Sequence, residues 1–85
     1  IATVNSIGKF SVYPNPSQDF IQLTGLENRL DYSLYIFSID GRLVLVNEKF
    51  NSQETLDISY LNSGIYWLKI RHDKLGENAI KIHKQ

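Results

Sequence analysis

Two histidines are the first residues in this 85-residue chain whose chemistry could matter. His72 and His83 stand eleven positions apart on different predicted strands, and neither has a thiol or a carboxylate at a metal-ligand spacing. Zinc sites usually draw four ligands from closely spaced His, Cys and carboxylate residues. The two histidines are therefore interpreted as surface residues, and no metal site is expected.

The sequence also lacks the motifs of known catalytic sites. The five glycines are scattered at predicted turns and form no phosphate-binding loop. Serine, histidine and aspartate are all present, but no pattern resembles a nucleophile elbow, and a chain of this length leaves little room for a pocket. The sequence predicts no enzyme activity and no cofactor.

Trp67 is the residue best suited to contact a partner. This single tryptophan alternates with Lys69 and Arg71, so all three are expected to point outward from one strand. An exposed tryptophan can stack on a sugar ring or on a partner, although cation–π packing with its own strand neighbours is the commoner explanation. Trp67, Lys69 and Arg71 are kept as a possible surface contact.

Charge and hydropathy exclude two classes of partner. The net charge is zero, which argues against a dedicated nucleic-acid-binding protein. Residues 1–68 carry four Lys/Arg against seven Asp/Glu and residues 69–85 carry five against two, so the C-terminal part is mildly basic. That patch is explained by solubility and by protection of an edge strand. No apolar run approaches the ~20 residues of a transmembrane helix, so membrane insertion is not expected.

Cysteine is absent, which excludes a disulfide framework and fits either redox compartment. The chain begins at Ile1 without the pattern of a signal peptide, so we expect it to be a piece of a longer protein. Residues 1–8 show little periodicity and are predicted to be a linker remnant, with one domain over 9–85.

Short apolar segments separated by turn residues predict the elements that must position these side chains. Strands are expected at 9–13, 19–24, 32–39, 42–49, 54–59, 64–72 and 78–84, which indicates an antiparallel sandwich or barrel. Asp40-Gly41 is predicted to form a type I′ hairpin turn. Alternation places Tyr66, Leu68 and Ile70 inside.

The faces of the remaining strands follow from the same alternation. Ile80 and Ile82 are expected in the core, with Lys81 and His83 outside. The strands at 32–39 and 42–49 are apolar on both faces, so they either lie centrally or have one face covered by loops or a neighbouring domain.

Both prolines of the chain, Pro14 and Pro16, lie in the stretch VYPNPSQDF. Each lacks an amide hydrogen and fixes its own φ, and each drives its predecessor toward extended geometry. The sequence predicts a stiff, unpaired connector that carries the chain over the edge of the sandwich. A rigid corner explains the stretch without any direct role in binding.

In order and spacing, VYPNP at 12–16, IFSIDGRLV at 36–44, LDISYLNSGIYWLKI at 56–70 and the closing IKIHK resemble the type A C-terminal sorting domain of the type IX secretion system. The resemblance covers 10–84. It implies an immunoglobulin-like β-sandwich of about seven antiparallel strands. The family pattern falls on Pro14, Asn15, Pro16, Asp40, Gly41, Leu61, Gly64, Ile65, Tyr66 and Lys81, to which Lys84 is added as part of the basic C-terminal strand. Trp67 departs from it, since a smaller apolar residue is more usual there.

The resemblance implies a secretion address carried by a larger exported protein of Bacteroidetes-type bacteria. Such a domain would be recognised in the periplasm by the translocation machinery, cross the outer membrane with its N-terminal cargo, and commonly be cut off at the cell surface by a sortase-like protease during attachment. The last strand, with Lys81, His83 and Lys84 outside, is hypothesised to be the signal proper, offering an edge for strand addition by a receptor.

Two other functions stay open at this stage. One is a carbohydrate-binding sandwich of a secreted hydrolase, with Trp67 and outward tyrosines as its platform. The other is a passive spacer of the fibronectin type III kind.

Overall fold

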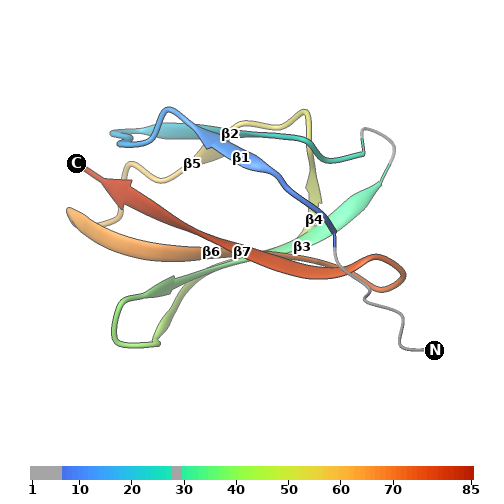
Figure 1. The fold of residues 1–85 in the computed structure, drawn as a ribbon. Coiled ribbons are helices and arrows are strands. Elements are labelled where there is room, and N and C mark those ends of the chain that lie inside the picture. Colours follow the sequence, from blue (N-terminus) through green and yellow to red (C-terminus); the bar gives the residue numbers. More distant parts are fainter. Residues whose placement is uncertain (1–6, 28–29) are drawn as a thin grey trace.

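The computed structural model describes residues 7–27 and 30–85 of the chain. Within them the chain forms strands and no helix (Figure 1). Residues 1–6, most of the predicted linker, lie outside the described residues. The strands are β1 (Ser11–Tyr13), β2 (Phe20–Thr24), β3 (Asp31–Ser38), β4 (Leu43–Asn51), β5 (Leu56–Asp57), β6 (Gly64–His72) and β7 (Gly76–Lys84).

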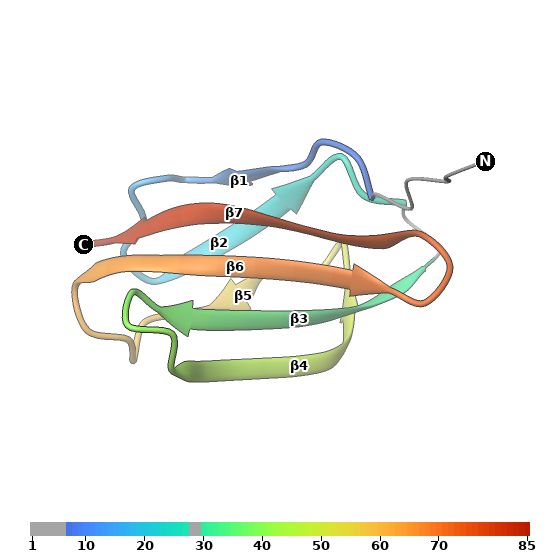
Figure 2. The same ribbon diagram turned by 60° about the horizontal axis from the view of Figure 1, so that its bottom comes forward.

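The strands form two antiparallel sheets packed face to face. One has the order β1-β2-β5 and the other β4-β3-β6-β7, and the two layers are seen edge-on in Figure 1 and obliquely in Figure 2. The predicted sandwich of seven antiparallel strands is confirmed. Immunoglobulin constant domains distribute their seven strands in a related way, but place the fourth strand in the first sheet. Here β4 pairs with β3 and enlarges the second sheet.

The core lies between the layers and follows the alternation of side chains along each strand. The residues predicted to be inside on β6 are buried, and Ile82 on β7 is buried with them, whereas Ile80 is half-buried. Tyr32 and Phe50, opposite each other on β3 and β4, close one end of this core. The side chains with no exposed surface are Ile21, Leu34, Ile36, Ile58, Leu68 and Ile70.

The hairpin between β3 and β4 has the predicted position but not the predicted turn type. Gly41 has a φ of 90°, whereas every described non-glycine residue, Asp40 included, has a negative φ. The Gly41 amide donates to the Ser38 carbonyl oxygen at 2.9 Å, and the Ser38 amide donates to that of Arg42 at 2.8 Å. This is a type I turn followed by a glycine bulge, the usual three-residue hairpin loop. Type I′ is wrong because it would place Asp40 in the left-handed region.

The outer faces of β3 and β4 differ in exposure. β3 is central, between β4 and β6. β4 is an edge strand, and its Leu43 and Val46 are 48% and 50% exposed. The sequence offered two explanations for strands that are apolar on both faces: a central position or a covered face. A central position is therefore correct for β3 only. In the described residues nothing buries these two side chains of β4.

Tyr66 locks the start of β6 to the turn before it. Its hydroxyl group donates a 2.6 Å hydrogen bond to the Asn62 carbonyl oxygen, four residues upstream, and its ring is buried. The same contact, called the tyrosine corner, occurs at the corresponding strand of immunoglobulin-type sandwiches. The tyrosine of the Gly-Ile-Tyr motif therefore has a structural role.

Replacing Tyr66 by Phe should lower the free energy of unfolding by about 1 kcal/mol, because one hydrogen bond is lost while the ring remains packed. Urea denaturation would measure the change. Tyr60→Phe is the matched control, since Tyr60 is 63% exposed. Equal stabilities of the two variants would contradict the role assigned to the Tyr66 hydroxyl.

Gly25 is constrained by space as well as by backbone angle. Its φ is 95°, and an added Cβ would lie 2.8 Å from the Lys9 carbonyl oxygen, whereas Gly41 has a φ of 90° and no atom within 4 Å of that position. Gly41→Ala should lower the free energy of unfolding by about 1–2 kcal/mol, because alanine is strained in the left-handed backbone conformation. Gly25→Ala should cost more, and thermal denaturation of the two variants would show the difference. Equal losses would mean that the backbone next to Lys9 moves aside freely.

Candidate functional site

The loop that connects β1 to β2, residues 14–19, is the candidate site and is called the proline loop below. Both of its prolyl bonds, Tyr13-Pro14 and Asn15-Pro16, are cis. The loop crosses from the three-stranded sheet to the outer edge of β7 in the other sheet. It thereby brings the YPNP motif against the last strand.

Asn15 binds the β7 backbone through both ends of its side-chain amide. Its Oδ1 atom accepts a hydrogen bond from the His83 amide at 2.9 Å. Its Nδ2 atom donates to the Lys81 carbonyl oxygen at 3.3 Å. One side chain thus takes the place that a neighbouring strand would occupy along this part of the edge.

Ser17 continues the same pairing through its backbone. Its amide donates to the His83 carbonyl oxygen at 2.9 Å, and its carbonyl oxygen accepts from the Gln85 amide at 2.7 Å. The residue forms a parallel bridge with Lys84 and is 1% exposed, while its hydroxyl group donates to the Pro14 carbonyl oxygen. The connector is therefore paired, contrary to the sequence interpretation. Between Lys81 and Gln85 the outer edge of β7 is already occupied, so strand addition there would have to displace the proline loop.

Lys84 also differs from the expectation. Lys81 and His83 point outward as predicted, but Lys84 is only 7% exposed. Alternation along β7 explains this, because Lys84 shares the face of Ile82. Its Nζ atom donates to the main-chain oxygen of Gln85 at 2.9 Å. Lys84 therefore contributes to packing at the end of the strand, and the outward basic group is Lys81.

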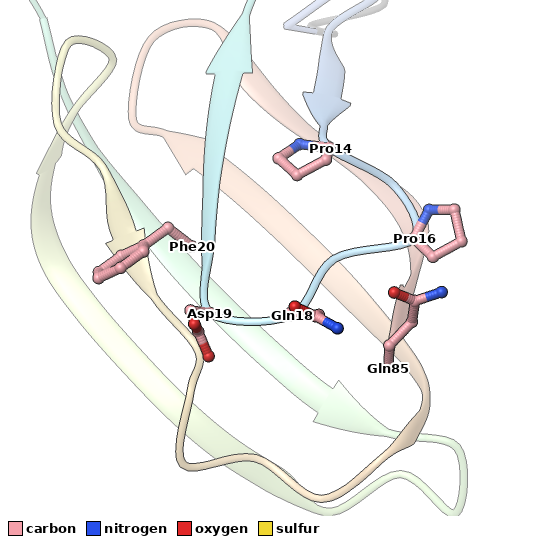
Figure 3. A pocket seen from close by; sticks show the side chains of 6 residues that line it. All are labelled: Pro14, Pro16, Gln18, Asp19, Phe20 and Gln85. Carbon is pink, nitrogen blue, oxygen red and sulfur yellow. The ribbon is translucent and has the colours of Figure 1, made fainter.

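Two adjoining hollows lie beside the proline loop. The larger, about 480 Å³, is lined by Pro14, Pro16, Gln18, Asp19, Phe20 and Gln85, and Figure 3 shows the loop passing between the end of β7 and Phe20. The smaller, about 260 Å³, is lined by Tyr13, Pro14, Phe20, Ile21, Gln22 and Thr55. Pro14 and Phe20 line both, and Phe20 is 54% exposed. The result is an open groove with aromatic and proline surfaces.

Most of the predicted motif positions gather at the same end of the sandwich as this groove. In an antiparallel order, the proline loop, the 38–42 hairpin, the 58–63 turn and the end of β7 must lie together, and Figure 2 shows them on one side. We call this side the motif end. It carries Pro14, Asn15, Pro16, Asp40, Gly41, Leu61, Gly64 and Lys84. Of the other motif positions, Ile65 and Tyr66 follow Gly64 at the start of β6, and Lys81 lies on β7.

Two aspartates at the motif end shape its turns. The Ser38 hydroxyl group and the Arg42 amide both donate to Asp40, and these bonds hold the pKa of Asp40 below its ordinary value. Asp57 accepts from the hydroxyl group and the amide of Ser59 at 2.7 and 2.9 Å, which likewise lowers the pKa of Asp57. Both carboxylates are exposed turn-forming groups.

The residues kept as a surface contact lie on another face, away from the groove. Trp67 is 42% exposed, and the cation over its ring is Lys81 of β7, 5.9 Å away. Lys69 lies 5.8 Å from the Tyr35 ring and pairs with Glu77 at 3.4 Å, and Arg71 pairs with Asp73 at 3.1 Å. The expected cation–π packing of Trp67 is present, but its cation comes from the neighbouring strand β7, because outward side chains meet across strands.

The two histidines have different surroundings. His72 packs edge-on against Tyr32 with ring centres 5.6 Å apart and accepts a hydrogen bond from the Lys74 amide, while His83 is exposed. Within residues 7–27 and 30–85 no group of three or more His, Cys, Asp or Glu side chains is placed to hold a metal ion. The same part of the chain contains no helix long and apolar enough to cross a membrane.

Comparisons with known proteins identify the family and support the fold. Residues 11–85 match the family model described as the secretion system C-terminal sorting domain. A solved structure of PorZ, an essential bacterial surface component of the type-IX secretion system of Porphyromonas gingivalis, superposes with a TM-score of 0.69 at 20% identity. The match covers 89% of this chain and 11% of the PorZ chain. The comparison with curated protein sequences gave no match.

The fold is a β-sandwich of seven antiparallel strands, and most of the motif positions lie at one of its ends. The chain belongs to the family of secretion system C-terminal sorting domains, the sorting signals of type IX secretion. Its class implies interaction with the secretion machinery and export across the outer membrane to the cell surface or the extracellular space. Sorting domains are not normally catalytic.

Asn15→Ala should loosen the end of β7, because the His83 amide and the Lys81 carbonyl oxygen both lose their partner. We expect a loss of about 1–3 kcal/mol in stability and faster hydrogen exchange at the His83 amide. Asn15→Asp retains the acceptor for His83 but not the donor to Lys81, so its effect on exchange should be smaller. Gln18→Ala, an exposed change in the same loop, is the control, and unchanged protection of His83 in Asn15→Ala would contradict the assignment.

Proposed function

We propose that the secretion machinery reads the motif end as one preformed surface, composed of the proline loop, the groove beside it and the end of β7. The proposal rests on the four hydrogen bonds that Asn15 and Ser17 make with residues 81–85. They fix two segments from opposite ends of the chain in a single arrangement. A receptor then meets a rigid surface, which reduces the conformational entropy lost on binding.

The groove supplies the apolar part of this surface. Phe20 and Tyr13 are 54% and 50% exposed and line the smaller hollow together with Pro14. Rigid aromatic and proline groups give contact area at low entropic cost, so they suit a docking site. Asp40, Gly41 and Tyr66 do not line the groove, so they are assigned to the turns at the motif end and not to direct contact.

The domain acts in this proposal without a reaction of its own. Residues 1–8 serve as the linker to an N-terminal cargo domain, residues 9–85 as the address. The address is recognised during transit through the periplasm, and a sortase-like component then cuts in the linker during attachment at the surface. Ile7 packs against the core, and the Asn78 side chain donates to the Gly8 carbonyl oxygen at 2.7 Å. The cut is therefore expected before Ile7.

The test is a secreted reporter fused to residues 9–85 and expressed in a bacterium with a type IX system. Deleting Lys81–Gln85 should abolish export, because it removes every β7 group that the proline loop binds. Equal export of the deleted and complete fusions would refute the proposal. Since the deletion also removes the core residue Ile82, a second variant is needed that keeps the fold.

Phe20→Ala serves this purpose, because Phe20 is exposed in the groove. We expect it to reduce export at least severalfold with normal unfolding behaviour. Trp67→Ala is the matched control, an exposed aromatic residue on the opposite sheet, and it should be exported like the parent. Loss of export in Trp67→Ala but not in Phe20→Ala would move the recognised surface to the other face.

A further inference from the structure

The outer face of the four-stranded sheet carries a second exposed surface, which lies outside the surface proposed for sorting. The rings of Tyr35, Phe37 and Trp67 lie together there and are bordered by Leu43 and Val46; we call these five side chains the aromatic platform. Strand register brings them together, because Phe37 is opposite both Trp67 on β6 and Leu43 on β4. The Tyr35 and Phe37 rings stack with centres 6.4 Å apart and planes 27° from parallel.

Two lysines stand over the rings of the platform. Lys81 is directly opposite Trp67 in the register, and Lys69 is directly opposite Tyr35, with ammonium groups 5.9 and 5.8 Å from the ring centres. Lys69 also pairs with Glu77, whereas Lys81 has no ion pair in the described part of the chain. Each ammonium group therefore lies over one ring, and the platform as a whole remains partly open to solvent, since Trp67, Leu43 and Val46 are each more than two-fifths exposed.

The dimensions of the platform limit what it can bind. Strands are about 4.8 Å apart and residues about 3.3 Å apart along a strand, so rings on β3 and β6 with their β4 border cover roughly 100–200 Å². A stable protein interface needs about 800 Å² from each partner. A second copy of the chain, or another protein held by this surface alone, is therefore a poor fit. A chain of sugar rings matches both the size and the flat aromatic surface.

We propose that the aromatic platform binds an acidic polysaccharide. Sugar rings stack on Trp67 and on the Tyr35–Phe37 pair, and carboxylate or other acidic substituents meet Lys81 and Lys69. The charge complementarity selects acidic over neutral chains, and screening by salt weakens it. The platform lies on a different sheet from the groove, and Lys81 contributes to both regions, through its side chain at the platform and through its backbone carbonyl at the proline loop.

Polygalacturonate is the probe, and dextran is its neutral counterpart. Trp67 is the only tryptophan, so its fluorescence emission should change on titration with polygalacturonate and change much less with dextran. In affinity electrophoresis, Trp67→Ala should weaken retardation by polygalacturonate about tenfold, equivalent to 1.4 kcal/mol. Phe20→Ala, which removes an exposed ring from the other sheet, should leave retardation unchanged.

Lys81→Gln separates charge from stacking and retains the tryptophan. It should reduce the preference for polygalacturonate over dextran and flatten the salt dependence of binding. No response of the parent, equal binding of the two polysaccharides, or equal loss in Phe20→Ala and Trp67→Ala would each overturn the proposal. So would dimerisation that Trp67→Ala abolishes, because the platform would then serve a second copy.

Discussion

The pairing of the proline loop with the edge of β7 is the contact on which the motif end depends. Asn15 and His83 are 68 residues apart in sequence, yet the side chain of one completes the backbone bonds of the other. The loop belongs to the three-stranded sheet and β7 to the four-stranded sheet, so these bonds fasten the two layers together at one end. An exposed strand edge presents unpaired backbone groups that could bind another chain, and the motif occupies these groups along this part of β7.

This arrangement explains why the family motif is distributed along the chain. Pro14, Asn15 and Pro16 belong to the loop that meets β7, and Lys81 and Lys84 lie on β7 itself. Other members support turns at the same end: Gly41 allows the bulge of the hairpin, and Tyr66 binds the turn before β6. Antiparallel connections return to the same end at every second turn, so residues far apart in sequence support one surface.

The local features of the fold could be predicted from the sequence, whereas the contacts between distant segments could not. Alternation correctly located the buried residues of β6, since a period of two is a property of each strand alone. The predicted turn type of the 38–42 hairpin was wrong because Asp-Gly is compatible with more than one kind of hairpin loop. The length of the loop decides which kind forms.

Lys84 shows most clearly what could not be predicted from the sequence. Its position beside Ile82 follows from alternation, but a lysine near the end of a chain is normally taken as solvent-exposed. Likewise, the prolines predicted a rigid corner, while nothing local indicated that Asn15 would reach β7. The cation over Trp67 could be identified only once the register of β6 and β7 was known, because Lys81 comes from the neighbouring strand.

The direction of the strands has a further consequence for attachment. Gly8 is held by Asn78 beside the hairpin of β6 and β7, at the end of the sandwich opposite the proline loop (Figure 2). A protein joined ahead of Gly8 would consequently be separated from the docking groove by the length of the strands. The same domain could then be fused to proteins of unrelated shape without steric interference at the groove.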